Sequence, residues 1–184
     1  MHDYDLVVGD VTDPQLAQYG QIDPLQPQTI LIPHVVNNIG AFGAGVAKTI
    51  KQRWPQTEKD YRFWLDFFSK HQRSILGQSF SSLVHCTDKL IIVVVHMFAQ
   101  EGVRRPQNNQ PLNYQHLQSC MNGVPEFGVV LNQPFTIHCP KFGAGLGGGS
   151  WEEIEKMIRN TWCAQNIPVT VYSYRRMYEQ KNSD

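Results

Sequence analysis

Two glycine-rich loops, each placed between an apolar stretch and an amphipathic one, constrain the fold of this 184-residue chain more than any other feature. The first follows the apolar residues 29–36 and occupies residues 37–47, and the second follows residues 135–139 and occupies residues 140–151. Glycine lets backbone N–H groups crowd around an anion, and a helix that starts behind the loop adds partial positive charge. The pattern predicts two anion-binding loops that grip a diphosphate from both sides.

Extended and helical patterns alternate along the chain. Strands are predicted at residues 6–8, 29–36, 75–85, 89–98, 135–139 and 169–174. Helices are predicted at residues 45–54, from a candidate N-cap at Thr57, at 114–121 and at 151–163, with a surface loop at 101–112. The alternation predicts an α/β fold: a three-layer α/β/α sandwich in one domain, residues 1–184, with a mixed, largely parallel sheet and an antiparallel strand at an edge. In such sheets ligands bind at the carboxyl ends of the strands, where both glycine loops fall.

The charge balance and the cysteines narrow the classes of partner. Lysine plus arginine equals aspartate plus glutamate, 16 against 16, which argues against nucleic acid as the main partner and against a membrane surface. The four cysteines show no CxxC spacing, so we expect buried free thiols and a reducing compartment. The beginning of the sequence is acidic and the longest aliphatic run, residues 90–95, is short, so a cytoplasmic protein is expected.

Several familiar motifs fail on a required position. The second loop matches GxGxxG, but no acidic residue stands about 20 positions further on to hold a ribose. The first loop has Ala47 where a nucleoside-triphosphate P-loop needs glycine before Lys48. Two His-Cys pairs lack the arginine of a cysteine-phosphatase loop, and no histidine spacing suggests zinc. We therefore expect no metal, no cofactor and no thiolate chemistry.

The arrangement resembles the macro domain, a family of ADP-ribose-binding modules, over nearly the whole chain. The resemblance rests on Val8-Gly9-Asp10-Val11-Thr12, on the two glycine loops, and on Glu152-Glu153-Ile154 after the second. Within the family the chain is most similar to the small ADP-ribose 1''-phosphate phosphatases, which carry a histidine three residues before the loop asparagine and an aromatic residue before the paired glycines. Here those residues are His34 and Phe42.

The resemblance implies a set of ligand-binding residues. Asp10, with Val11 beside it, would accept a hydrogen bond from the adenine amino group, and Tyr174 would stack on the adenine, or Tyr172 if the last strand is shifted. Backbone N–H groups of the two loops would hold the diphosphate: Gly43, Ala44, Gly45 and Val46 from the first, and Phe142, Gly143, Ala144, Gly145, Leu146 and Gly147 from the second. The last three loop glycines, 147–149, have two alternative explanations. Either they let the distal phosphate approach closely, or they make the loop mobile.

The resemblance also implies candidate catalytic residues. Asn37 would face the distal ribose, although an asparagine there can also serve the loop backbone, a role that fits Asn38 better. His34 is a candidate general acid or base, with a packed strand histidine as the alternative. Gln100 would border the distal ribose, and His96 is a weaker candidate at the same edge.

These residues predict an ADP-ribose-binding hydrolase that removes the phosphate of ADP-ribose 1''-phosphate with a positioned water. Two alternatives stay open: a deacylase or mono-ADP-ribosyl hydrolase that uses the same pocket, and a non-catalytic ADP-ribose reader. The expected partners are ADP-ribose and its derivatives, with ADP-ribosylated macromolecules as a further class.

Overall fold

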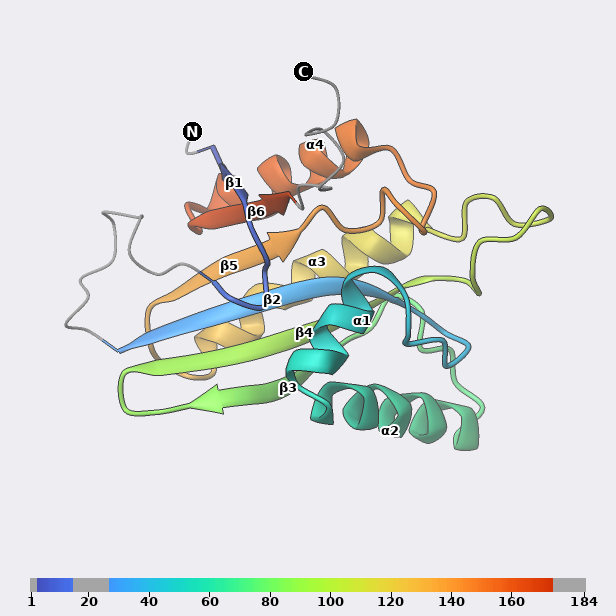
Figure 1. Ribbon diagram of the computed structural model, residues 1–184, viewed down its shortest axis with the longest axis horizontal. Helices are drawn as coiled ribbons and strands as arrows, with labels where there is room; N and C mark the ends of the chain where they lie inside the picture. Colours follow the sequence, from blue (N-terminus) through green and yellow to red (C-terminus); the bar gives the residue numbers. More distant parts are fainter. Residues whose placement is uncertain (1–2, 15–26, 174–184) are drawn as a thin grey trace, which may run out of the picture.

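The computed structural model describes residues 3–14 and 27–173, which form one six-stranded sheet with helices on both faces (Figure 1). Its strands are β1 (Asp5–Val8), β2 (Gln28–Asn37), β3 (Ser79–Cys86), β4 (Leu90–Gln100), β5 (Phe135–Pro140) and β6 (Val169–Ser173). Their order across the sheet is β1-β6-β5-β2-β4-β3. All neighbouring strands are parallel except β3, which pairs antiparallel with β4 at one edge.

The helices cover the two faces of the sheet in pairs. They are α1 (Gly45–Arg53), α2 (Gln56–Lys70), α3 (Tyr114–Val129) and α4 (Trp151–Thr161), and a short 3₁₀ turn, Cys163–Gln165, follows α4. In β2, Leu31 and Val35 pack with α3 and α4, whereas Ile30 and Ile32 pack with α1 on the opposite face. This alternation follows from the two-residue period of a strand, and it confirms the predicted three-layer fold.

The predicted elements differ from the structure in three places. The strand predicted at 75–85 starts only at Ser79, and the helix predicted at 114–121 continues to Val129 through Pro125. That helix continues because Val124 and Pro125 are buried against the sheet, so its apolar face does not end where its polar residues suggested. Thr57 is not an N-cap: Pro55 occupies that position, and the Thr57 hydroxyl donates to the Trp54 carbonyl at 2.7 Å.

The cysteine prediction is correct for three of the four thiols. Cys120, Cys139 and Cys163 are buried, whereas Cys86, the last residue of the edge strand β3, is exposed. A strand at the edge of a sheet lacks a neighbour on one side, which leaves its end open to solvent. Within residues 3–14 and 27–173, no helix is both long enough and apolar enough to cross a membrane.

Candidate functional site

The two glycine loops meet at the carboxyl ends of the parallel strands. The first connects β2 to α1, and the second connects β5 to α4, so both lie at the same edge of the sheet (Figure 1). A Cβ built on Gly45 would lie 3.5 Å from Cδ1 of Leu146, so the tip of the second loop packs beside the start of α1. Two segments about 100 positions apart in sequence thus face each other over the ends of β2 and β5.

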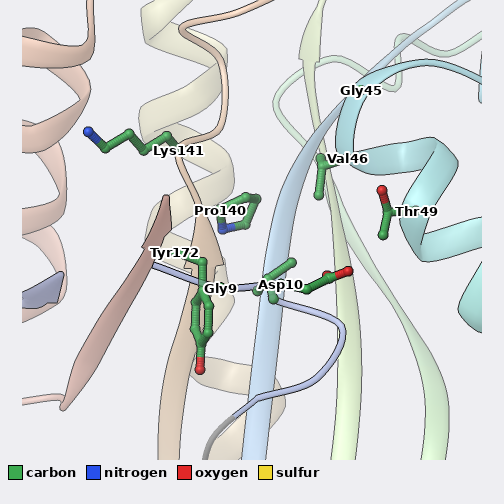
Figure 2. A pocket seen from close by; sticks show the side chains of 9 residues that line it. Gly9, Asp10, Gly45, Val46, Thr49, Pro140, Lys141 and Tyr172 are labelled. Atoms are coloured by element: carbon green, nitrogen blue, oxygen red, sulfur yellow. The ribbon is translucent and has the colours of Figure 1, made fainter. Parts of the chain in front are cut away.

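A cleft of about 350 Å³ opens next to this junction (Figure 2). It lies between the turn after β1, the first turns of α1 and the end of β5, with β6 beside it. The residues that line it are Gly9, Asp10, Val11, Gly45, Val46, Thr49, Pro140, Lys141 and Tyr172. The cleft therefore unites four of the predicted ligand-binding residues, Asp10, Val11, Gly45 and Val46.

Asp10 is held in a fixed orientation at the mouth of this cleft. Its Oδ1 accepts hydrogen bonds from the Thr12 backbone N–H at 2.9 Å and from the Thr12 hydroxyl at 2.8 Å. Among residues 3–14 and 27–173 these are the only donors to the carboxylate, and both use Oδ1. The second oxygen is thus left to accept a hydrogen bond from a ligand.

Tyr172, the alternative to Tyr174, lies in the wall of the cleft. Its ring lies against Gly9, whose Cβ position is 3.6 Å from Tyr172 Cδ1, and only 3% of the residue is exposed. Its hydroxyl lies 2.9 Å from Nδ1 of His138. Tyr174 lies outside the described residues.

Of the two helices that follow the glycine loops, α1 has an N-terminus better suited than that of α4 to bind an anion. Its first turn contains no acidic residue, and its N-cap, Ala44, offers no side chain to the free N–H groups. The first turn of α4 carries Glu152 and Glu153, which repel an anion. The N-terminus of α1 is therefore the main anion-binding element at this edge of the sheet, and the second loop lies opposite it.

The glycines of the two loops fall into two classes. A Cβ on Gly43 or on Gly145 would meet no protein atom within 4 Å, so packing does not require glycine at either position. A Cβ on Gly147 would lie 2.5 Å from the Gly143 carbonyl oxygen, and one on Gly149 would lie 2.5 Å from Cδ2 of Leu112. The second class is glycine because backbone passes close to Gly147 and the Leu112 side chain packs close to Gly149.

Glycines 147–149 pack closely against the segment that precedes α3. Gly148 has φ of +70° and its Cβ would collide with the Asn109 carbonyl oxygen, while the buried Gly147 accepts a hydrogen bond from the Leu112 N–H at 3.1 Å. The run joins the second loop to the segment before α3. Packing therefore explains why position 147 is glycine, while the role of its backbone N–H in ligand binding stays a prediction.

Asn37 organises the first loop from within. Its Oδ1 accepts from the backbone N–H groups of Ile39 and Ala41, both at 3.1 Å, and its Nδ2 donates to the Ala41 carbonyl at 2.6 Å. Asn38 instead accepts from the Gly102 N–H at 2.9 Å and ties the loop to the segment after β4. The expectation that Asn38 serves the loop backbone better than Asn37 is wrong, because the amide of Asn37 already bonds to three backbone groups and has one N–H left for a ligand.

His34 lies beneath the first loop and not in the cleft. It is fully buried, its Nε2 lies 2.8 Å from Nδ1 of His96, and Ser82 Oγ lies 3.0 Å from Nε2 of His96. Burial, and secondarily the nearby His96, holds the pKa of His34 well below its usual value, and burial lowers the pKa of His96 to about 4. The packed-histidine alternative is therefore the one that the structure supports, and neither ring reaches solvent to exchange a proton with a substrate.

Phe142 was predicted to bind ligand, and Gln100 was a candidate catalytic residue. The Phe142 side chain is buried and packs edge-on against Trp162, and its backbone N–H donates to the Pro140 carbonyl at 2.7 Å. Gln100 ends β4 in register with Asn37, and its carbonyl accepts from the Asn38 N–H at 3.1 Å. Gln100 therefore borders the first loop, and Phe142 belongs to the core.

Sequence analysis missed Tyr61 as part of the site. It lies in α2, and its hydroxyl bonds to the first loop, where Gly40 N–H donates to it at 3.0 Å. Thr49 and Lys141 were also missed as cleft residues. The sequence signal for the Tyr61 contact is its hydroxyl on an otherwise apolar helix face, because a buried tyrosine hydroxyl usually has a hydrogen-bond partner.

The comparisons with known proteins agree with this architecture, although no family model matches the chain. The chain is 23% identical over 146 residues, 78% of its length, to an ADP-ribose 1''-phosphate phosphatase of Candida albicans, of which the match covers 86%. It superposes on a macrodomain protein from Streptomyces coelicolor with a TM-score of 0.69 and 26% identity, over 94% of this chain and all of that one. The chain therefore has the fold of a macro domain and resembles proteins of that family in sequence.

A macrodomain whose structure contains a bound ligand is also similar to this chain. A mutant macrodomain of Oceanobacillus iheyensis with ADPR matches with a TM-score of 0.63 at 17% identity, over 93% of this chain and 84% of that one. At this identity the likeness concerns the fold alone. The fold is thus shared with that macrodomain, and the side chains of this chain decide what its own cleft binds.

Proposed function

We propose that this macro domain binds ADP-ribose and hydrolyses the phosphate of ADP-ribose 1''-phosphate. The observation that carries the proposal is the cleft that joins the free carboxylate oxygen of Asp10 to the uncapped start of α1. It offers an acceptor for the adenine amino group at one end and backbone donors for the diphosphate at the other. The name of the Candida albicans relative supports the choice of substrate.

In this arrangement the protein contributes position and electrostatics. The N–H groups around Gly43, Gly45 and Gly145 hold the diphosphate, and the empty space beside Gly43 and Gly145 lets a phosphate approach the backbone. The distal ribose then lies over the ends of β2 and β4, where Asn37 offers its remaining N–H and Gln100 stands beside it. A water held there attacks the phosphorus and the bond from phosphorus to the ribose oxygen breaks. One proton of the water passes to that oxygen, so that the products are the ribose hydroxyl and inorganic phosphate.

A second candidate, a non-catalytic ADP-ribose reader, is favoured by one specific observation. The histidine expected to move a proton, His34, is fully buried, and the Asn37 amide is largely used by the loop. A site without a side chain that transfers protons binds well and reacts slowly. Turnover therefore has to be measured separately from binding. A deacylase or mono-ADP-ribosyl hydrolase would use the same cleft.

Calorimetry with ADP-ribose, followed by phosphate release from ADP-ribose 1''-phosphate, tests the proposal. The informative variant is Gly145→Val, because its side chain fills space that no protein atom within 4 Å of the Cβ position occupies. The matched control is Gly123→Ala in α3, which also adds a Cβ into open space but lies outside the loops. We expect Gly145→Val alone to lose binding and release. Binding without phosphate release identifies the reader, and absence of binding in the wild type refutes the proposal.

A further inference from the structure

The segment that leaves β4 is a hairpin-like arm fixed to both glycine loops. We call residues 101–111 the arginine arm; Figure 1 shows it projecting beyond the carboxyl edge of the sheet between β4 and α3. Its two sides pair at the base, where Glu101 N–H donates to the Pro111 carbonyl at 2.9 Å. They pair again near the tip, where Arg105 and Asn108 exchange backbone hydrogen bonds of 2.9 Å. The arm therefore has a defined course.

Contacts to the loops anchor the arm beside the site. On the first loop, Asn38 Oδ1 accepts from the Gly102 N–H at 2.9 Å. On the second loop, the Asn109 carbonyl packs directly against Gly148, and Leu112, just after the arm, donates to the Gly147 carbonyl at 3.1 Å. Arg104 is two residues from the Gly102 anchor, at most about 7 Å of extended chain.

The arm carries two arginines against one acidic residue. Arg104 and Arg105 are exposed, and Glu101 stands at the base. Among residues 3–14 and 27–173, the ion pairs use Lys51, Arg62, Lys156 and Arg159 as cations, so neither arginine of the arm is neutralised by a carboxylate there. The chain has no net charge, so this local pair is not part of a general positive field.

The order of the strands sets the direction of the ligand if the proposed function is correct. The Asp10 cleft lies over β1, β6 and β5, and the glycine loops follow β5 and β2. A ligand that runs across these loops ends over β2 and β4, and the arm begins where β4 ends. Lys141 is on the other side: it lines the cleft (Figure 2), and its Nζ lies 5.2 Å from the centre of the Trp151 ring.

We propose that Arg104 and Arg105 bind a phosphate group carried on the distal ribose, so that the arginine arm makes the site prefer the phosphorylated ligand over ADP-ribose itself. The inference rests on the proposed function, since it assumes that ADP-ribose lies in the cleft. A terminal phosphate carries nearly two negative charges at neutral pH, and the backbone donors of the loops are already used by the diphosphate. Arginine meets such a group with two parallel N–H donors.

The test compares two ligands in the wild type and in Arg104→Ala/Arg105→Ala. Calorimetry gives Kd for ADP-ribose and for ADP-ribose 1''-phosphate, and KM with kcat replaces Kd for the latter if phosphate is released. We expect the double variant to reduce the preference for the phosphorylated ligand at least tenfold while its affinity for ADP-ribose changes less than threefold. Arg104→Lys/Arg105→Lys restores part of the preference, because the charge remains while the fork of donors is lost.

The matched control is Lys70→Ala/Lys89→Ala, which also removes two exposed positive charges. Lys89 precedes β4, at the end of that strand opposite the arm, and Lys70 ends α2. The control is expected to keep the preference. An unchanged preference in the arm variant, or an equal loss of affinity for both ligands, overturns the inference while the proposed function stands. A wild type that does not bind ADP-ribose overturns both.

Discussion

The hydroxyl of Tyr61, on helix α2, lies 2.9 Å from the Asn37 carbonyl oxygen and 3.0 Å from Asn37 Oδ1, and it also accepts from the Gly40 N–H. One buried hydroxyl thus connects a helix to the turn that opens the first glycine loop. The Tyr61 ring is fixed in turn by stacking on Phe98, with ring centres 5.4 Å apart, and by contact with Phe42. The rigidity of the anion-binding loop therefore depends on the packing of α2.

Tyr61→Phe is expected to weaken ADP-ribose binding several-fold. The substitution keeps the ring but leaves the Gly40 N–H and the Asn37 oxygens short of a partner, which lowers the free energy of unfolding by about 1–3 kcal/mol. Calorimetry and denaturant unfolding measure the two effects. The matched control is Tyr4→Phe, which removes a hydroxyl that donates to Glu155 at 2.5 Å beside α4, outside the loops. Equal binding by the two variants would contradict this role for Tyr61.

Asp10→Asn is expected to weaken ADP-ribose binding about tenfold or more. The amide oxygen can still accept from Thr12, so the turn is kept, but an NH₂ group replaces the free carboxylate oxygen and opposes the adenine amino group. Titration calorimetry measures the loss, and circular dichroism checks the fold. The control is Asp13→Asn, an exposed aspartate of the same segment. Unchanged affinity in Asp10→Asn would show that this carboxylate does not bind the base.

The buried histidines are expected to make the protein less stable below about pH 6.5. Burial lowers the folded-state pKa of His96 to about 4, so the unfolded chain binds this proton at a higher pH than the folded one. The stability contributed by neutral His96 is complete above the unfolded pKa and is lost as the pH falls toward 4. At about 1.4 kcal/mol per pKa unit, His96 accounts for roughly 3 kcal/mol of this loss.

Urea unfolding at a series of pH values measures this dependence. His96→Gln is expected to flatten the fall in stability between pH 6.5 and pH 4, since it removes the titrating ring. His85→Gln, which replaces an exposed histidine on the neighbouring strand β3, is the control and should leave the slope in place. A slope that is the same in all three proteins would disprove the assignment.

One thiol is expected to react quickly in the folded protein. Cys86 is exposed, whereas burial raises the pKa of Cys120 to about 11 and also raises the pKa values of Cys139 and Cys163. Titration with a chromogenic disulfide should therefore show one fast thiol in buffer and four in denaturant. Cys86→Ser should abolish the fast phase, and a fast phase that survives would show that a second thiol opens readily.

The sequence by itself determined the layers and the placing of the loops. The apolar runs of β2 and β4 and the glycines at the strand ends are local signals, and they suffice to predict a parallel sheet with both glycine loops at one edge. The positions of Asp10, Gly45 and Val46 in one cleft follow from that topology. Element ends were less certain, as at Thr57 and Val129, because burial decided them.

Only the tertiary structure decided the roles of individual polar residues. Nothing local to His34 says that Phe42 and His96 cover it, and nothing local to Asn37 says that its amide is used by Ile39 and Ala41. Glycines look alike in a sequence, yet Gly145 faces open space and Gly147 faces the backbone of Gly143. These distinctions depend on which atoms from distant segments occupy the surrounding space, and that is fixed only when the layers pack.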